Sequence, residues 1–278
     1  MKILLAGASG VVGRKVCPLL LGAGHEVVAI TRQVPPIETR DSALRWRIVD
    51  VYDRSNLMGV LVEEHPDVVI HQMTDLRDQN PAANARLRTL GTRNLVDAAL
   101  AANVQSIVAQ SIAWAYVPGA EAATETDPLD ADALAPRRTT IEGVLALESA
   151  VSEMNHHVIL RFGTLYGPGT WYANDGSFAQ KLRVGDFKTT TAITNFLHVE
   201  DAAIATVQAL RWPSGVVNIV DDTPARAAEW LPAYAEELSA KAPPIEIATP
   251  DWSRPVSNVY ARSLGWNPKH PTWRFGFI

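Results

Sequence analysis

The residues best suited to chemistry form a glycine-rich segment near the start of the chain, Gly7-Ala8-Ser9-Gly10-Val11-Val12-Gly13. It follows a short apolar run and precedes a helical pattern, which is the context in which such glycines bind a dinucleotide. Gly7 permits a tight turn, Gly10 lets the backbone approach a pyrophosphate, and Gly13 permits close packing of helix on strand. The helix start then offers N–H groups and partial positive charge to the phosphates. We therefore predict a dinucleotide site at Gly7, Ser9, Gly10, Val11, Val12 and Gly13; the alternative is a purely structural turn.

The end of the second expected strand bears on the choice between NAD(H) and NADP(H). An NAD site commonly places an acid there, to bind the ribose 2′-hydroxyl. This chain reads Ile30-Thr31-Arg32-Gln33, without an acid. Arg32 is able to pair with a 2′-phosphate through charge-assisted hydrogen bonds, and Arg14 is placed to help. We predict NADP(H) rather than NAD(H); the alternative is that Arg32 is an ordinary surface arginine.

The elements that must position these residues alternate between strand and helix along the first two thirds of the chain. Such alternation predicts an α/β fold, a Rossmann-type doubly wound parallel sheet with a small C-terminal substrate-binding cap. The dinucleotide-binding domain is expected at 1–162, with 195–220 returning to it, and the cap at 163–194 and 221–278. Residues 163–194 are expected to form loops. The expected strands are 3–6, 26–30, 46–49, 67–70, 106–109, 158–160 and 216–220, and the expected helices are 11–21, 55–64, 82–102, 137–154, 199–210 and 223–239.

Composition narrows the class of partner. The 278 residues are 47% apolar and 20% charged, with a formal net charge of −5, so neither a disordered chain nor a nucleic-acid binder is expected. The single cysteine, Cys17, excludes an intrachain disulfide and fits a cytoplasmic location. No apolar run reaches the roughly 20 residues of a membrane span. Histidines and carboxylates lack the spacing of metal ligands, so no metal is expected. The expected partner is a small-molecule substrate.

Further motifs lie along the expected strands, helices and loops. They are Asp50-Val51-Tyr52-Asp53, Val68-Val69-Ile70-His71, Gly91-Thr92-Arg93-Asn94-Leu95-Val96, Leu165-Tyr166-Gly167-Pro168-Gly169 and Phe196-Leu197-His198-Val199-Glu200-Asp201. With the glycine segment, they make the chain resemble the extended short-chain dehydrogenase/reductase family, the NAD(P)-dependent epimerase/dehydratases.

The resemblance implies roles for particular residues. Asp50 would accept a hydrogen bond from the adenine amino group, and Val51 would offer its backbone N–H to the ring. Met73 and Thr74 would line the path of the ribose. Ser111, at the end of the fifth strand, would stand where the family has its catalytic serine or threonine, able to polarise a substrate carbonyl; the alternative is that it caps a turn. A homodimer is also implied.

The chain departs from the family at the catalytic acid. The family uses a tyrosine and a lysine four residues apart, and counting back from Glu148 these positions fall on Thr140 and Val144. No Tyr-x-x-x-Lys occurs in the sequence. A threonine has too high a pKa to act as a general acid near neutrality. We predict a catalytic set of Ser111, Tyr166 and Thr140, with Tyr166 as the proton donor. The other candidate donors are Tyr116, Tyr172 and His198.

The substrate is expected to be small and apolar. The arginine that grips a nucleotide-sugar diphosphate in the family is missing before Phe196, and Trp114, Trp171 and Tyr172 are candidates to stack on a flat substrate. Arg88 stands where the family often has asparagine. We predict an NADP(H)-dependent oxidoreductase that reduces a carbonyl or conjugated system of an apolar or aromatic metabolite, as in natural-product tailoring. The alternatives are an epimerase, isomerase or dehydratase that uses the cofactor transiently, and a noncatalytic NADP-binding regulator.

Overall fold

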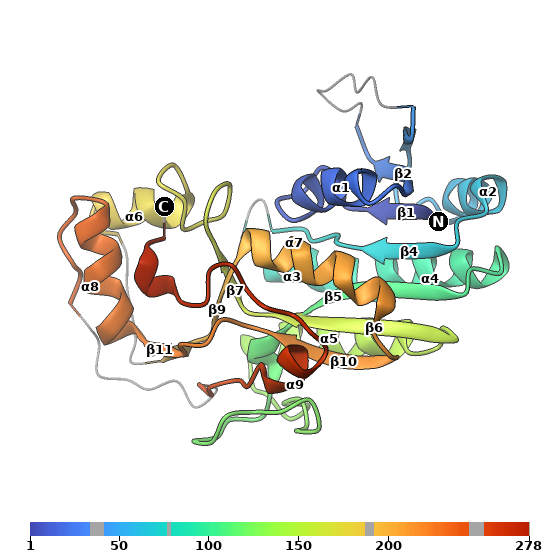
Figure 1. Cartoon of the computed structure of the whole chain (residues 1–278). Coiled ribbons are helices and arrows are strands. Elements are labelled where there is room, and N and C mark those ends of the chain that lie inside the picture. Colours follow the sequence, from blue (N-terminus) through green and yellow to red (C-terminus); the bar gives the residue numbers. More distant parts are fainter. Residues whose placement is uncertain (34–41, 77–78, 187–191, 245–252, 278) are drawn as a thin grey trace. The chain divides into compact units, whose positions relative to one another are not determined.

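The chain forms two compact units, each of which is built from several stretches of sequence. The structure is a computed structural model that describes residues 1–33, 42–76, 79–186, 192–244 and 253–277 (Figure 1). The first unit comprises Met1–Ser111, Ala131–Leu160 and Thr206–Val216, and the second comprises Ile112–Asp130, Arg161–Ala205 and Val217–Ile278. The division into a domain at 1–162 and a cap stays a prediction. Among the described residues, no helix is both long and apolar enough to cross a membrane.

A seven-stranded parallel sheet is the framework of the fold. Its strand order is β10-β6-β5-β4-β1-β2-β3. The order reverses between β1 and β4, and in such sheets ligands bind beyond the carboxyl ends of the strands at that point. This confirms the predicted fold class. The strands are β1 Lys2–Ala6, β2 Glu26–Thr31, β3 Leu44–Ile48, β4 Val68–His71, β5 Ser106–Ile112, β6 His156–Phe162 and β10 Gly215–Ile219.

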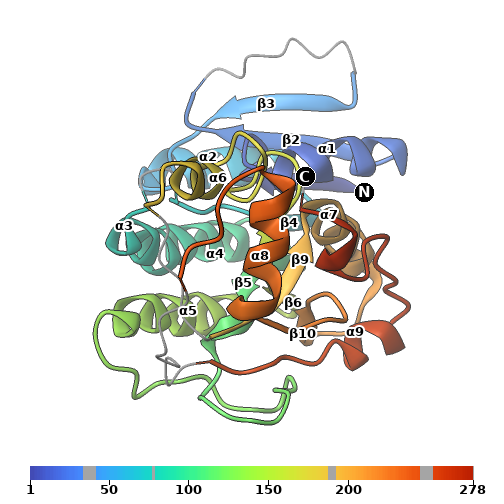
Figure 2. The same cartoon turned by 90° about the vertical axis from the view of Figure 1, so that its left-hand side faces the viewer.

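Helices cover both faces of the part of the sheet in the first unit. They are α1 Gly13–Gly22, α2 Arg54–Glu64, α3 Pro81–Arg86, α4 Thr92–Ala101 and α5 Arg137–Val151. Helices α2, α4 and α5 lie on one face and α1 on the other (Figure 2). Because both faces are covered, strands such as β1 and β4 are apolar almost throughout. The core between the sheet and the first group includes Leu57, Leu61, Leu95, Ala99, Leu147 and Val151.

The helix expected at 82–102 contains a wider turn. Between α3 and α4 the residues Leu87–Gly91 form a π-helix, and the backbone stays right-handed helical at both junctions. Such turns are rare and often lie at functional sites. The last residue of this turn, Gly91, is a glycine for a steric reason. A Cβ there would lie 2.7 Å from Leu87 Cδ1 and 3.2 Å from Val51 Cγ2. The glycine therefore lets this helix approach the segment after β3.

The second unit has short elements around an aromatic cluster. The expected loop region 163–194 contains β7 Thr164–Tyr166, α6 Ser177–Arg183 and β8 Ile193–Thr194, so the loop prediction was wrong there. The expected helix at 223–239 also needs correction, because β11 Ala225–Arg226 pairs with β8 before α8 Ala227–Glu237 begins. The remaining elements of this unit are β9 Phe196–His198, α9 Val259–Ser263 and two 3₁₀ turns, Ala113–Ala115 and Trp273–Phe275. Helix α7 Val199–Gln208 passes from the second unit to the first, and a 3₁₀ turn at Ala209–Arg211 follows it.

Candidate functional site

The glycine turn between β1 and α1 is closely packed. Gly7 has a φ of +92°, and a Cβ on it would lie 2.6 Å from the carbonyl carbon of Gln72, just after β4. The N–H of Gly10 donates to the Gly7 carbonyl oxygen at 2.9 Å. A Cβ on Gly13 would lie 2.1 Å from that same oxygen. Side chains at Gly7 and Gly13 would therefore force the turn apart, as a dinucleotide-binding turn requires.

The outer surface of this turn fits a pyrophosphate. Ser9, Gly10 and Val11 are exposed, and Val12 is buried beneath them. The first turn of α1 holds no acidic residue. The N–H groups of Arg14, Lys15 and Val16 donate to the carbonyl oxygens of Gly10 and Val12, so what the helix start offers a phosphate is chiefly its positive partial charge. Arg14 Nε donates to the Ser9 carbonyl oxygen at 2.8 Å. That bond fastens Arg14 to the turn itself, a role that the sequence did not suggest.

The segment after β3 is held in place from two sides. Asp50 is exposed, and its Oδ1 accepts a hydrogen bond from the Tyr52 N–H at 2.9 Å. The buried Asn94 on α4 donates to the Val51 carbonyl oxygen at 2.8 Å. This fixes Asp50 and Val51 at the carboxyl edge of the sheet, where the resemblance puts the adenine.

Arg32 belongs to the same edge. The Val49 N–H donates to the carbonyl oxygen of Thr31, the residue before Arg32, at 2.8 Å. The segment after β3 therefore runs beside the end of β2, and the side chain of Arg32 is exposed there.

The end of β4 is organised by a buried histidine. His71 Nδ1 accepts from the Met73 N–H at 3.2 Å, and His71 Nε2 lies 2.9 Å from Thr92 Oγ1. Burial, together with the nearby charge of Arg88, lowers the pKa of His71 to about 4. The imidazole is therefore neutral at pH 7, and the network assigns its proton to Nε2, facing Thr92. It orients Met73, while Thr74 is exposed beyond it.

Ser111, near the end of β5, is directed into the interior of the first unit. It is 1% exposed, and its hydroxyl donates to Glu148 Oε1 on α5 at 2.6 Å. Arg88 from the π-helical turn is also buried; burial lowers its pKa to about 10, and the charge of Glu148 opposes that shift. A substrate oxygen would have to compete with a carboxylate for the Ser111 proton. The role of Ser111 stays a prediction, and its bond to Glu148 had no signal in the sequence.

Helix α5 carries the two positions at which the sequence departs from the family. Thr140 is half-buried in its first turns, whereas Val144 is fully buried. A Cβ on the neighbouring Gly143 would lie 3.0 Å from Ala85 Cα on α3. The lysine position is thus occupied by an apolar side chain on a tightly packed face, and Val144 has no charge to lower the pKa of a neighbouring hydroxyl.

The candidate tyrosine acids lie in the interior of the second unit. Tyr166 is 1% exposed, and its hydroxyl is buried without a hydrogen-bond partner among the described residues. Its ring makes edge-to-face contacts with Phe196, His198 and Phe277, at centroid distances of 5.9, 5.1 and 5.6 Å. Burial raises the pKa of Tyr166 far above its ordinary value, the direction opposite to that of a useful acid. Its role as proton donor stays untested, but this environment disfavours it.

The other aromatic candidates also pack against protein. The buried Tyr172 has a pKa raised by burial, and its ring contacts the half-buried Phe178 at a centroid distance of 5.0 Å. Trp171 lies 5.3 Å from the ring of the same phenylalanine. The hydroxyl of Tyr116 donates to Asn218 Oδ1 at 2.6 Å. These contacts make all three aromatic residues part of the packing of the second unit.

Three possible metal ligands meet in the second unit. Ligand atoms of His198, Glu200 and His270 lie within 4.8 Å of one another. Asp201 brings His270 there, because its carboxylate accepts the N–H groups of Lys269 and His270 at 2.7 and 2.8 Å. The two imidazoles, however, stack at a centroid distance of 3.6 Å with a tilt of 32°. Nitrogen lone pairs lie in the ring planes, so rings stacked in this way do not point at one ion. That no metal binds stays a prediction.

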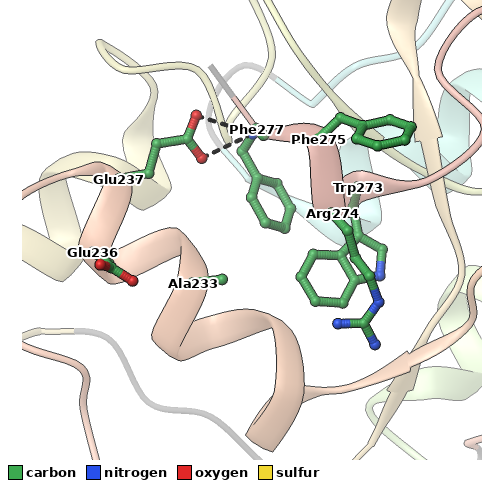
Figure 3. Close-up of a pocket in the computed structure, with 8 residues that line it drawn as sticks. Ala233, Glu236, Glu237, Trp273, Arg274, Phe275 and Phe277 are labelled. Carbon is green, nitrogen blue, oxygen red and sulfur yellow. Dashed lines mark hydrogen bonds between the residues drawn. The ribbon is translucent and has the colours of Figure 1, made fainter.

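A pocket of about 350 Å³ lies in the second unit, and none of the residues predicted from the sequence lines it. The rings of Trp273 and Phe277 face Ala233 of α8 across it (Figure 3). Glu237 closes one side, where its carboxylate oxygens accept the Phe277 N–H at 3.2 and 2.9 Å. The pocket gathers no set of convergent catalytic groups.

The parallel sheet and its glycine turn define a nicotinamide dinucleotide-dependent enzyme of the extended short-chain dehydrogenase/reductase type. Residues 3–220 match the model of the NAD dependent epimerase/dehydratase family, and the chain belongs to that family. This confirms the resemblance seen in the motifs.

Two curated relatives and a solved structure illustrate the range of this family. The chain is 39% identical to a 3-diazoavenalumate denitrifying reductase from Streptomyces sp, over 99% of both chains. It is 23% identical to a dTDP-6-deoxy-L-talose 4-dehydrogenase (NAD(P)(+)) from Kitasatospora kifunensis, over 96% of this chain and 91% of that protein. The UDP-glucose 4-epimerase of Thermus thermophilus, solved with NAD, superposes with a TM-score of 0.76 at 23% identity, covering 97% and 94% of the two chains. At that identity, the likeness concerns the fold.

Proposed function

We propose that this protein is an NADPH-dependent reductase that replaces the diazo group of a small conjugated carboxylate by hydrogen. The full-length relative named as a denitrifying reductase of 3-diazoavenalumate supports the substrate class. This refines the function predicted from the sequence, the reduction of a conjugated system in a small metabolite. In net terms, a hydride forms a C–H bond, the C–N bond breaks, and its electron pair leaves with N₂.

The observation that carries this proposal is the loss of the acid pair on α5. Hydride reduction of a carbonyl creates an alkoxide that must be protonated, which is the task of a general acid. Here Thr140 cannot serve near neutrality, and the buried Val144 carries no charge. In its diazonium form, R–N₂⁺, a diazo group takes up one hydride and releases N₂ with no net proton, and this is the form that we propose as the substrate. This reaction therefore does not need the general acid that the site lacks. Carbonyl reduction, or epimerisation through a ketone, would need that acid.

The proposed cofactor site uses residues of the first unit alone. When bound, the nicotinamide supplies a hydride from its C4. The turn residues Gly7, Ser9, Gly10, Val11, Val12 and Gly13 would hold the pyrophosphate. Asp50 and Val51 would hold the adenine, and Met73 and Thr74 would flank the ribose. The exposed Arg32 and the absence of an acid at the end of β2 favour NADPH.

The test measures the release of N₂ and the consumption of NADPH in the same reaction. Purified protein is given NADPH and ¹⁵N-labelled 3-diazoavenalumate, with a no-enzyme reaction as the background. We expect one labelled N₂, by mass spectrometry, for each NADPH lost at 340 nm. A Gly59→Ala variant should match the wild type, since no atom lies within 4 Å of a Cβ there. Ketone reduction without N₂ release would identify a carbonyl reductase instead. Tight NADPH binding with no turnover on either class would favour the regulator.

A further inference from the structure

An aromatic ring and an arginine are paired at the carboxyl edge of the first unit. Arg86 is the last residue of α3, and its guanidinium carbon lies 4.2 Å from the centroid of the Tyr52 ring. This is a cation–π contact. Tyr52 is itself fixed, because its N–H donates to Asp50 Oδ1 at 2.9 Å. The contact therefore holds the guanidinium group at Tyr52, next to Asp50, the residue that the family uses for the adenine.

The charges of four groups act on the Tyr52 hydroxyl. Burial raises the pKa of Tyr52, the charges of Arg86 and Arg32 lower it, and those of Asp75 and Asp50 raise it. These groups come from the ends of three strands of the sheet and from α3, so the topology of the sheet brings them together. Arg86 contacts this ring directly, and Arg32 follows Thr31, whose carbonyl oxygen accepts the Val49 N–H at 2.8 Å, beside the segment that carries Tyr52.

Both guanidinium groups are free to bind an anion. Arg32 and Arg86 are exposed, and within the described part of the chain neither forms a salt bridge. The arginines of α2 and α4, in contrast, form salt bridges. Arg54 pairs with Asp97 at 3.1 Å, and Arg93 pairs with Asp97 at 2.8 Å and with Glu153 at 2.6 Å. A guanidinium that rests on a ring by its face keeps its edge N–H groups for a bidentate bond to phosphate.

We propose that Arg86, seated on Tyr52, is a second ligand of the 2′-phosphate of NADP(H), acting together with Arg32. This rests on the proposed cofactor. A phosphate monoester carries up to two negative charges near neutrality, and two unpaired arginines match that charge. Arg86 would therefore determine cofactor specificity as much as the arginine at the end of β2 does. Tyr52 would be a positioning residue, which limits the orientations of Arg86.

Calorimetric titration of Arg86→Gln with NADPH, NADH, 2′,5′-ADP and 5′-AMP separates the phosphate from the adenine. We expect Kd to rise at least tenfold for NADPH and 2′,5′-ADP and to stay unchanged for NADH and 5′-AMP. Tyr52→Leu should reproduce part of this loss, while Tyr52→Phe keeps the ring and should match the wild type. Arg54→Gln is the matched control, because it removes an arginine of the same unit without affecting Tyr52. Thermal melting of each variant checks the fold.

The outcomes distinguish this inference from the cofactor proposal. If the wild type binds NADH as tightly as NADPH, both are overturned. If the wild type prefers NADPH and Arg86→Gln keeps that preference, only the role of Arg86 is overturned. An equal loss of affinity for NADPH and NADH would also overturn it, because Arg86 would then bind the adenine or the shared phosphates.

Discussion

Replacing Gly13 by alanine should disable the cofactor site with little change elsewhere. The added Cβ would lie 2.1 Å from the Gly7 oxygen and 2.8 Å from Ala8 Cα, where an ordinary contact is about 3.5 Å. The turn must therefore open by about 1 Å, which is enough to break backbone hydrogen bonds to a phosphate. Each bond to a charged group contributes about 1.5–3 kcal/mol. Losing two of them predicts an increase in the Kd for NADPH of at least about 100-fold.

The assay is calorimetric titration of NADPH into Gly13→Ala, with Gly59→Ala as the matched control. Both changes add one methyl group to a helix of the first unit, but at Gly59 the methyl meets no atom within 4 Å. The control should bind NADPH like the wild type and be more stable by about 0.5–1 kcal/mol, because alanine favours a helix over glycine. Circular dichroism of both variants shows whether the fold is retained.

One result would refute this reasoning. If Gly13→Ala binds NADPH within threefold of the wild type and melts at the same temperature, the close contact with Gly7 does not govern the turn. The assignment of the turn to the phosphates would then lose its steric basis.

Three further predictions concern buried groups. The pKa of His71 is about 4 in the folded state and about 6.5 in the unfolded state, so the free energy of unfolding should fall by about 3 kcal/mol as the pH is lowered from 6.5 to 4. Denaturant titrations of His71→Gln at several pH values should lack this dependence of the unfolding free energy on pH. An unchanged dependence contradicts the assignment. Ser111→Ala should lower the free energy of unfolding by about 1–3 kcal/mol, since Glu148 loses a donor, without changing cofactor affinity; unchanged turnover would remove Ser111 from the mechanism. Tyr166→Phe should keep both stability and rate, whereas a tenfold slower rate would restore Tyr166 as the acid.

Patterns that are local in sequence were sufficient for the fold. The apolar run of β1 and the glycines after it are adjacent, so their geometry follows from their own conformations and contacts. Alternating strands and helices then restrict the topology, because crossovers between parallel strands have one hand. For the same reason, the sequence predicts that the candidate cofactor residues lie at one edge of the sheet.

Contacts between distant residues were not accessible in this way. Nothing in the sequence joins Ser111 to Glu148, and the direction of a side chain near a strand end depends on which helix covers it. The wide turn at Leu87–Gly91 was missed because its apolar spacing resembles that of an ordinary helix. Tyr166 lies in a family motif, but its enclosure by aromatic rings depends on segments far along the chain.

The wide turn at Leu87–Gly91, in the helix that follows β4, also sets how far the second half of that helix is rotated relative to the first. Before it, Arg86 reaches Tyr52, and after it, Thr92 reaches His71. If these five positions formed a regular α-helix with no residue removed, the second half would be rotated by about 100° relative to the first, because the wide turn takes up about one extra residue. One of the two contacts would then be lost. The wide turn is therefore what allows a single helix to make both contacts.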